Sequence, residues 1–499
     1  MASRPEELTF GELDRRSENL ADYFGSRGLT AGDHIAILME NRLEFIVACW
    51  AAQRSGLLYT PVNWHLTEEE AAYVVNDCGA KILVAGSEVA DLCARVRAQC
   101  PSVGTALMTD DPHEGFDSFD QACGTDQLDA SHEEVEGSYF FYSSGTTGRP
   151  KGIQLAHDFP TYGAGLRLDL MVGAGFGIGQ TEVYLSPAPL YHAAPLGWTL
   201  SSLRNGATVV LMDRFEPIPF LQAIQAYGVT HMQVVPTMFV RLLKSVIADR
   251  GEFDISSLRL VVHAGAPCPV EVKRQVIEWF GPIVLEYYAG SEGVGMTTIT
   301  SQEWLEHPGS VGRPVLGSVH ILDPDGRELA PGEVGAVYFD GGGTFKYHND
   351  AEKTSAALDS RGRATLGDLG HLDDHGYLYL SDRRSDLILS GGVNIYPQEI
   401  ENAIILHDAV ADVAVIGVPD QEMGQRVHAV VQLAPHADGH DISDVLSAHC
   451  RQHLAGFKCP RSISFVEEVP RTPAGKLLRR RVREEFIEPV AGSTPLASS

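Results

Sequence analysis

The feature that most constrains the fold is the repeated alternation of helical segments with short apolar strands in the first part of the chain. Residues 8–24 and 43–55 predict helices, and residues 34–39 and 81–84 predict strands. Thr67 opens a Thr-Glu-Glu-Glu string, which is the capping box that begins a helix. Such alternation is typical of a parallel sheet that is covered by helices.

A second set of the same kind follows further along the chain. We expect strands at 182–189, 208–212, 231–235, 258–262 and 283–287, and helices at 218–227, 236–248 and 269–280. Residues 100–135 are acidic and weakly patterned, and we expect a surface connection there. The predicted fold class is therefore α/β, with a large N-terminal domain of two doubly wound αβ layers.

The pattern changes after the second set. Residues 309–347 form short apolar runs separated by turn residues, which predicts a small β-rich unit. A charged cluster at 382–386 predicts a boundary, so we expect an N-terminal domain over 1–384 and a small α+β C-terminal domain over 385–499. In the C-terminal domain we expect helices at 397–406, at 441–454 and from Lys476 onward, and strands near 410–418, 427–433 and 462–467.

The amino-acid composition limits the kinds of partner and the cellular location that we expect for the protein. The chain has 66 Asp and Glu against 38 Lys and Arg, and its formal net charge of −28 argues against nucleic acid or an anionic membrane surface as a partner. The eight cysteines form no Cys-x-x-Cys pair and indicate reduced thiols. No stretch reaches the roughly 18 apolar residues that cross a bilayer, so we expect no integral membrane segment and a cytoplasmic location.

The stretch from Ser138 to Gly152 has the layout of a loop that holds phosphate. An aromatic, strand-like run leads into a turn of hydroxyl residues and glycines that closes with Arg149 and Lys151. Glycines let backbone N–H groups approach an anion, hydroxyls add donors, and the two cations balance its charge. It is not a Walker A loop, because that motif needs Gly-Lys followed by Ser or Thr; a flexible surface loop is the alternative. The candidate phosphate ligands are Ser143, Ser144, Gly145, Thr146, Thr147 and Gly148, and Gly152 is a further glycine of the loop.

This string resembles the phosphate-loop signature of the adenylate-forming superfamily, which comprises acyl-CoA synthetases, amino-acid adenylation domains and firefly-type luciferases. The string from Tyr288 to Glu292 resembles the Tyr-Gly-x-Thr-Glu motif of that family. The resemblance implies that Tyr288 stacks on adenine, Ser291 contacts a phosphate oxygen and Glu292 binds Mg²⁺, a hard cation that prefers carboxylate and phosphate oxygens. A strand-end turn with a solvated glutamate is the alternative.

Other motifs follow in the order of the family. Gly265 and Ala266 lie in a string that resembles its adenine and acyl loop. Asp368 and Arg383 resemble the residues that contact the ribose, and an ionised carboxylate is a natural acceptor for a vicinal diol. We interpret residues 371–375, which contain two histidines and two aspartates, as a hairpin turn rather than a metal site.

The C-terminal part carries the remaining motifs. Gly391 and Gly392 lie in a family-specific string whose glycines suit a path for the CoA thiol. Ser385 occupies the position at which, by resemblance, a mobile C-terminal domain pivots between two orientations. Lys476 resembles the lysine that pairs with the substrate carboxylate and the α-phosphate; alternatively, it begins a solvated basic helix.

The Tyr191-His192 pair bears on the substrate. Amino-acid adenylation domains hold the ammonium of their substrate with an aspartate at this place, and here an α-ammonium would be buried without a counter-charge. A plain carboxylic acid fits better. By resemblance His192 lies near the acyl and thiol path, although it could be a simple strand-end histidine. The catalytic residues that we expect are Lys476, Glu292, Lys151 and His192.

The resemblance implies an acyl-CoA synthetase that uses ATP, Mg²⁺ and coenzyme A to convert a carboxylic acid into acyl-AMP and then into a thioester. Within the family the chain most resembles fatty-acyl-CoA ligases, so we expect a medium- or long-chain fatty acid. Residues 171–179 and the small Gly265, Ala266 and Gly290 suggest a roomy apolar pocket, which does not itself specify chain length or ring content. The alternatives are a bulky aryl or steroid-type acid, an acyl-AMP ligase that loads a carrier protein, and a catalytically inactive nucleotide-binding regulator. The expected partners are small molecules, and a homodimer is left open.

Overall fold

The structure is a computed structural model that describes residues 6–110, 113–124, 134–143, 150–245, 250–383, 386–435, 437, 442–472 and 475–487. Its first layer is a parallel sheet in the order β5-β4-β3-β1-β2-β6. The strands are β1 (His34–Leu38), β2 (Leu58–Pro61), β3 (Ile82–Ala85), β4 (Thr105–Met108), β5 (Asp117–Ser118) and β6 (Ser138–Tyr139). The helices are α1 (Phe10–Ser26), α2 (Leu43–Arg54), α3 (Glu68–Asp77), α4 (Ala90–Ala98) and α5 (Phe119–Gly124).

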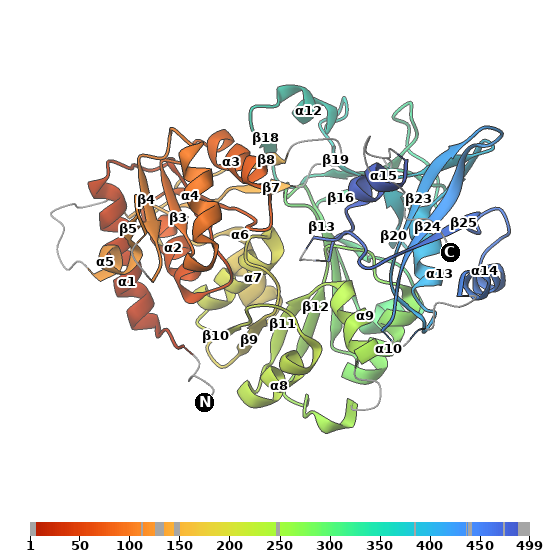
Figure 1. Cartoon of the computed structure of the whole chain (residues 1–499), viewed down its shortest axis with the longest axis horizontal. Coiled ribbons are helices and arrows are strands. Elements are labelled where there is room, and N and C mark those ends of the chain that lie inside the picture. The colour runs from red at the N-terminus through yellow and green to blue at the C-terminus, as the bar shows by residue number, and fades with distance from the viewer. Residues whose placement is uncertain are drawn as a thin grey trace.

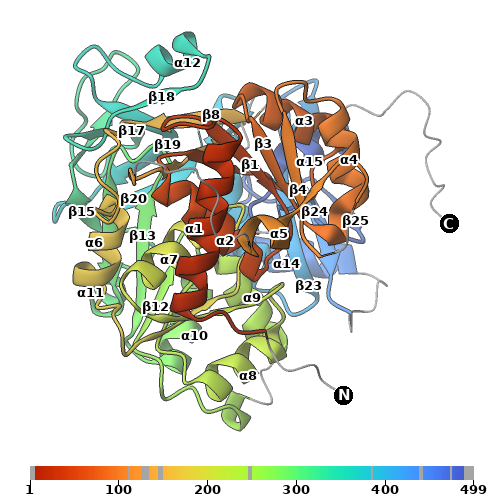
Figure 2. The same cartoon turned by 90° about the vertical axis from the view of Figure 1, so that its left-hand side faces the viewer.

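Helices cover both faces of this sheet, as Figure 2 shows. Side chains of α1, α2 and α5 form one apolar cluster with the strands, and those of α3 and α4 form another on the opposite face. The predicted capping box is present, because the Thr67 side chain accepts a hydrogen bond from the Glu70 N–H and the Glu70 carboxylate accepts one in return. The alternation of the sequence therefore produces the layer that it predicts.

The second layer is a seven-stranded sheet in the order β10-β9-β11-β12-β13-β14-β15, parallel except for its last two strands. The strands are β9 (Val183–Ser186), β10 (Thr208–Leu211), β11 (His231–Val234), β12 (Leu260–His263), β13 (Val284–Ala289), β14 (Met296–Thr300) and β15 (Arg313–Leu316). The helices are α6 (Arg167–Leu170), α7 (Ala193–Arg204), α8 (Pro217–Tyr227), α9 (Pro236–Ser245), α10 (Val270–Phe280) and α11 (Ser301–Glu306).

Helix α7 lies between the two layers. Leu196 and Leu200 pack into the core of the first layer, whereas Trp198 packs against the second sheet. Helices α8, α9 and α10 cover the other face of the second sheet, at the bottom of Figure 1. This confirms the predicted pair of αβ layers and places the start of α7 where both layers meet.

Two small antiparallel sheets sit above the second layer (Figure 1). One has the order β16-β17-β19-β20 and the other β18-β8-β7. Their strands are β7 (Phe141–Ser143), β8 (Lys151–Leu155), β16 (Ser318–Leu322), β17 (Gly335–Asp340), β18 (Phe345–Tyr347), β19 (Ala364–Leu372) and β20 (Leu378–Arg383), and helix α12 (Ala351–Ala356) follows β18. The β-rich unit expected over 309–347 is thus confirmed, and it continues through β20.

The C-terminal part has its own sheet, in the order β22-β21-β24-β23 with β25 paired to β24. Its elements are β21 (Ile388–Ser390), β22 (Val393–Ile395), α13 (Pro397–Ile404), β23 (Val410–Asp420), β24 (Gly424–Leu433), α14 (Ile442–His453), β25 (Ser462–Val466) and α15 (Arg479–Ile487). This α+β unit lies beside α9 and α10 in Figure 1.

Two expectations from the sequence were wrong. The stretch 100–135 is not only a connection, since it contributes β4, β5 and α5 to the first layer. These elements are too short to show a clear period in the sequence. The basic helix begins at Arg479 rather than at Lys476, which lies in a turn where the Lys476 carbonyl accepts a hydrogen bond from the Thr472 N–H.

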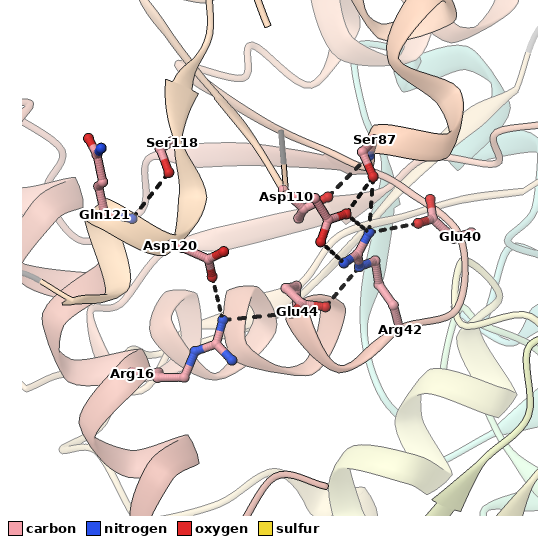
Figure 3. Close-up of polar contacts among 10 residues, drawn as sticks. Arg16, Glu40, Arg42, Glu44, Ser87, Asp110, Ser118, Asp120 and Gln121 are labelled. Carbon is pink, nitrogen blue, oxygen red and sulfur yellow. Dashed lines mark hydrogen bonds and ion pairs between the residues drawn. The ribbon is translucent and has the colours of Figure 1, made fainter. Parts of the chain in front are cut away.

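A polar cluster holds the loop that follows β1, at the carboxyl edge of the first sheet (Figure 3). The Arg42 guanidinium donates to Glu40 at 3.0 Å, to Glu44 at 2.8 Å and to both oxygens of Asp110. Because several carboxylates hold one guanidinium, the loop over residues 40–44 has a defined course. Within the described residues, no helix is long and apolar enough to cross a membrane.

Candidate active site

The predicted phosphate loop joins the two strands of an antiparallel hairpin. Ser143 at the end of β7 pairs with Lys151 at the start of β8. Ser144, Gly145, Thr146, Thr147 and Gly148 lie outside the described residues. Gly152 follows Lys151 in β8, and a Cβ there would lie 2.8 Å from the Phe140 ring. Packing against Phe140 therefore also favours glycine at this position, and its expected approach to an anion stays a prediction.

Lys151 and Glu292 are brought together by Tyr347, a residue that the sequence analysis missed. Strand β18 pairs with β8 with Tyr347 opposite Ile153, which carries the tyrosine to the phosphate-loop hairpin. The Tyr347 hydroxyl donates to Glu292 Oε1 at 2.9 Å, and Lys151 Nζ lies 4.9 Å from the centre of the Tyr347 ring. Burial, followed by the ammonium of Lys353, lowers the pKa of Lys151. A polyanion bound beside Lys151 would stabilise its charged ammonium form and so raise its pKa.

The donor set around Glu292 fits Mg²⁺ bound together with phosphate. Tyr347 occupies Oε1, and Oε2 is directed at Gly290, where a Cβ would approach it to 2.7 Å. No group of three or more Asp, Glu, His or Cys side chains that could hold a metal occurs in the described part of the chain. A single carboxylate that completes its coordination with substrate phosphates is the arrangement that Mg²⁺ commonly accepts in proteins.

Tyr288 and Asp368 form the next part of the site. The Tyr288 hydroxyl donates to Asp368 Oδ2 at 2.6 Å, and its ring lies 5.9 Å from that of Phe339. Asp368 pairs across the β19–β20 hairpin with Arg383, which brings these two predicted ribose residues into register. The side chain of Arg383 lies outside the described residues, as does Ser385.

The small residues predicted for nucleotide binding lie at strand ends of the second sheet. Gly265 and Ala266 follow β12, and Gly265 has a φ of +84°, which favours glycine. Gly290 and the exposed Ser291 follow β13, and a Cβ on Gly290 would meet Leu366 at 2.4 Å. The carboxyl ends of β12 and β13 therefore converge with the β19 segment that carries Asp368, at the edge of the sheet where α/β folds bind ligands.

A buried charge cluster lies beneath these strand ends. Lys273 of α10 donates to Glu286 of β13 at 2.6 Å, and both side chains are buried. The fully buried His263 at the end of β12 lies 3.6 Å from the same carboxylate. Burial is the first cause that raises the pKa of Glu286 and lowers that of His263.

His192 is the residue that precedes α7, and Lys476 of the C-terminal part lies near enough for its charge to affect the His192 pKa. Burial and, second, the Lys476 ammonium lower the pKa of His192 to about 4, so the imidazole is neutral at pH 7. Its Nε2 is buried and makes no hydrogen bond to the described residues. A Cβ on Gly475 would lie 2.0 Å from Thr237 Oγ1, so the loop that carries Lys476 packs directly on the start of α9. Lys476 thus reaches the site across the two parts of the chain.

Asn41 positions the loop that carries His192, and the sequence analysis did not identify it. Its Nδ2 donates to the carbonyl of Ala188 at 3.1 Å and to that of Met212 at 2.9 Å, and its Oδ1 accepts from the Leu190 N–H at 2.8 Å. Its neighbours in the sequence belong to the Arg42 cluster of Figure 3. A single polar side chain in a loop gives no periodic signal from which this role could be read.

The remaining predicted residues lie apart from this centre. Gly391 and Gly392 form the exposed turn between β21 and β22, with φ values of +56° and +80°. A Cβ on Gly391 would meet Met423 of the same unit. A further contact between the two parts is made by Lys244 of α9, whose ammonium donates to the carbonyls of Ile405, at 3.0 Å, and Val410. Burial lowers the pKa of Lys244 to about 8.

Comparison with known proteins agrees with this geometry. Residues 1–347 match the family described as AMP-binding enzyme, and residues 399–476 match the AMP-binding enzyme C-terminal domain. The chain is 32% identical to a feruloyl-CoA synthase from Amycolatopsis sp., over 96% of this chain and 94% of that protein. It is 31% identical to the long-chain-fatty-acid–CoA ligase FadD13 of Mycobacterium tuberculosis, over 96% of this chain and 93% of that protein.

A solved structure shows the same fold. The crystal structure of ATP-bound MatB from Rhodopseudomonas palustris is 28% identical and has a TM-score of 0.81, with 97% of this chain and 94% of that chain covered. The family match spans more than half of the chain and includes Lys151 and Glu292. The chain therefore belongs to the AMP-binding enzyme family, within the adenylate-forming superfamily that its motifs resemble.

Proposed function

We propose that the protein is an AMP-forming acyl-CoA synthetase. The observation that carries the proposal is the joining of Lys151 to Glu292 through Tyr347, in a chain whose Lys476 turn packs on the start of α9 beside the second sheet. The relatives named above are CoA ligases, which supports the same reaction class. The proposed substrates are a carboxylic acid, ATP and coenzyme A.

In the first half-reaction a carboxylate oxygen of the acid attacks the α-phosphorus of ATP, and the bond to pyrophosphate breaks. Lys151 and the phosphate loop would hold the β- and γ-phosphates, and Tyr288 and Asp368 would hold the nucleoside. Lys476 would lie between the carboxylate and the α-phosphate, where an ammonium offsets the repulsion of two anions. Mg²⁺, held by Glu292 and the phosphates, would neutralise charge on the leaving pyrophosphate.

In the second half-reaction the CoA thiolate attacks the acyl carbon, and AMP leaves. Residues 1–384 and 385–499 are proposed to be two domains that reorient about Ser385 between the half-reactions, which would bring Gly391 and Gly392 to the thiol path. The neutral imidazole of His192 is proposed to line the acyl path without adding a charge near the reacting thiolate. The exposure of both glycines and their positive φ angles are compatible with close approach of a ligand to the backbone.

The test is product analysis with ATP, Mg²⁺, coenzyme A and a series of acids. We expect AMP, pyrophosphate and an acyl thioester, and acyl-AMP without CoA. Formation of ADP and phosphate would contradict the proposal, and absence of ATP–pyrophosphate exchange with every acid would favour the inactive regulator. A second candidate is an acyl-AMP ligase that loads a carrier protein, because a fatty acid–[acyl-carrier-protein] ligase of Streptomyces coeruleorubidus is 31% identical over 96% of the chain. Thioester formation on a carrier protein but not on CoA would support it.

The identity of the acid stays a prediction. Related proteins are named for feruloyl, long-chain fatty acyl and 2-succinylbenzoate substrates, so relationship alone supports both the fatty acid and the aryl alternative.

A further inference from the structure

The first two turns of α7 lead away from the reacting centre into the second layer. The helix begins directly after His192, and Ala194 and Trp198 share one face because they are four residues apart. Both side chains belong to the apolar cluster between α7 and the second sheet, together with Tyr184 and Val262. The acyl part of a substrate whose carboxylate lies beside Lys476 would therefore extend along this face of α7.

Trp198 is fixed at the far end of that face. Its indole N–H donates to the Tyr287 hydroxyl at 3.3 Å, and the two rings are stacked with an interplanar angle of 27°. The Phe176 ring lies 5.0 Å from the indole on another side. Tyr287 precedes Tyr288 in β13, and alternation along a strand points Tyr287 toward α7 while Tyr288 faces the nucleotide site. The indole is thus hydrogen-bonded to β13, the strand that also carries Tyr288, the residue proposed to stack on adenine.

Exposure differs sharply on the two sides of Trp198. Beyond the indole, the central members of the cluster are closed to water, since Tyr184 and Val262 are 1% exposed and Val172 is 0% exposed, whereas Phe176 at its rim is partly exposed. Toward the reacting centre, Ala193 and Ala194 at the start of α7 are small and partly exposed, as are Ala266 after β12 and Gly290 after β13. This fall in exposure makes the region between His192 and Trp198 the candidate space for an acyl group, with the indole at its end.

The length of this space follows from helix geometry. Trp198 lies six positions after His192, which at 1.5 Å per residue corresponds to roughly 9 Å along the axis. An extended chain advances about 1.2 Å per bond, since a three-bond residue spans at most ~3.6 Å. About seven bonds therefore fit, which accommodates a single ring with a short linker but not a long alkyl chain.

We propose that Trp198, held by Tyr287, forms the floor of the acyl pocket, and that the enzyme activates a compact acid with one ring. This inference rests on the proposed function and selects between its substrate alternatives. The ring is favoured because Trp198, Tyr287 and Phe176 present aromatic surfaces, on which a planar ring stacks better than a flexible chain. The segment 171–179 then closes the pocket instead of enlarging it, because Val172 and Ile178 are buried in the same cluster.

The experiment measures ATP–pyrophosphate exchange for wild type, Trp198→Ala and Tyr287→Phe, with benzoate, cinnamate, hexanoate, decanoate and palmitate. We expect kcat/KM of wild type to be at least 100-fold higher for cinnamate than for palmitate. Trp198→Ala should raise kcat/KM for decanoate at least 10-fold and raise KM for cinnamate. Tyr287→Phe keeps the ring but loses the hydroxyl, and should shift the profile in the same direction by less. Trp279→Ala, a tryptophan of α10 on the other face of the sheet, should leave the profile unchanged.

The possible outcomes distinguish a failure of the inference about the acyl pocket from a failure of the proposed function. Equal efficiency of wild type with palmitate and cinnamate, or an unchanged acid profile in a folded Trp198→Ala variant, would overturn the inference and leave the proposed function standing. If Trp198→Ala fails to fold, Trp198→Phe replaces it, and the same shift toward longer acids is required. Absence of exchange with all acids, in a protein that still binds ATP, would overturn the proposed function and with it this inference.

Discussion

The carboxamide of Asn41 accepts a 2.8 Å hydrogen bond from the Leu190 backbone N–H, although 149 residues separate the two. This bond joins the loop after β1 in the first layer to the loop that ends in His192. Asn41 is buried, and its amide nitrogen satisfies two further carbonyls. One side chain therefore sets how the first layer presents the start of α7 to the reacting centre.

Replacing Asn41 should weaken catalysis more than nucleotide binding. Asn41→Ala removes the partner of two buried backbone groups, each worth about 1–3 kcal/mol, and of the partly buried Met212 carbonyl. We expect kcat of adenylation to fall about 10-fold while KM for ATP stays within twofold, together with a lower free energy of unfolding. Asn76→Ala, which removes a single exposed amide bond to the Gln99 carbonyl, is the matched control and should change neither rate. An equal rise in KM for ATP would mean that Asn41 supports the whole site and not the His192 loop.

Lys476 should act in one half-reaction only. It lies in a turn before α15, so it is not the first residue of a solvated helix. Lys476→Ala should lower acyl-AMP formation by about 10² or more, which is the scale for losing a preorganised charge contact. Conversion of supplied acyl-AMP to the thioester should remain near normal. Arg480→Ala, an exposed cation of α15, is the control; parallel defects in both half-reactions would assign Lys476 to folding or general affinity.

The buried pair of Lys273 and Glu286 should matter for stability. Lys273→Met removes the only ammonium beside a buried carboxylate among the described residues, and breaking such a pair costs about 3–5 kcal/mol. The double variant Lys273→Met, Glu286→Leu should recover much of that loss, because no charge then stays buried. Protonation of Glu286 removes the uncompensated charge, so the single variant should lose less relative to wild type at pH 5.5 than at pH 8. Urea unfolding of the three proteins measures this, and equal losses at both pH values would contradict it.

The imidazole of His192 should make the protein less stable in acid. Its pKa is about 4 in the folded state, and an unfolded histidine titrates near 6.5. Between pH 6.5 and about pH 4, His192 is protonated in the unfolded state but neutral in the native state. The free energy of unfolding therefore falls as the pH drops through this window. The contribution is about 3 kcal/mol at most, at 1.36 kcal/mol for each pH unit. His192→Gln should flatten the slope of unfolding free energy between pH 6.5 and 4.5, and an unchanged slope would mean that His192 is protonated in the native state.

The sequence indicated the layers because their helices and strands are periodic over many residues. The segment α10, for example, was expected at 269–280 and occupies Val270–Phe280. Motif residues at strand ends were also found, since the carboxyl ends of parallel strands share one edge. Gly265 and Gly290, for example, follow β12 and β13, and the structure joins Tyr288 of β13 to Asp368 by a hydrogen bond, although the two are 80 residues apart.

Contacts that a single side chain makes between distant segments could not be predicted from the sequence. Tyr347 reaches Lys151 only because a three-residue strand pairs with β8, and a strand of that length has no detectable period. The packing of Trp198 was not read from the sequence for a related reason. Glycines in 171–179 suggested space, and the structure packs Trp198 of the next helix against Val172, Phe176 and Ile178 of this segment.

Gly475 limits how closely the two parts of the chain can meet. Its φ of +79° and the 2.0 Å approach of a Cβ to Thr237 mean that one added methyl group would act as a wedge under the turn that delivers Lys476. The turn that carries Lys476 therefore has no room for one further carbon atom at its neighbour. Gly475→Ala should lower acyl-AMP formation but not thioester formation, as Lys476→Ala does, although the Lys476 ammonium is intact. Adding Thr237→Gly should restore part of the activity, because it removes the side chain that the new methyl group would contact.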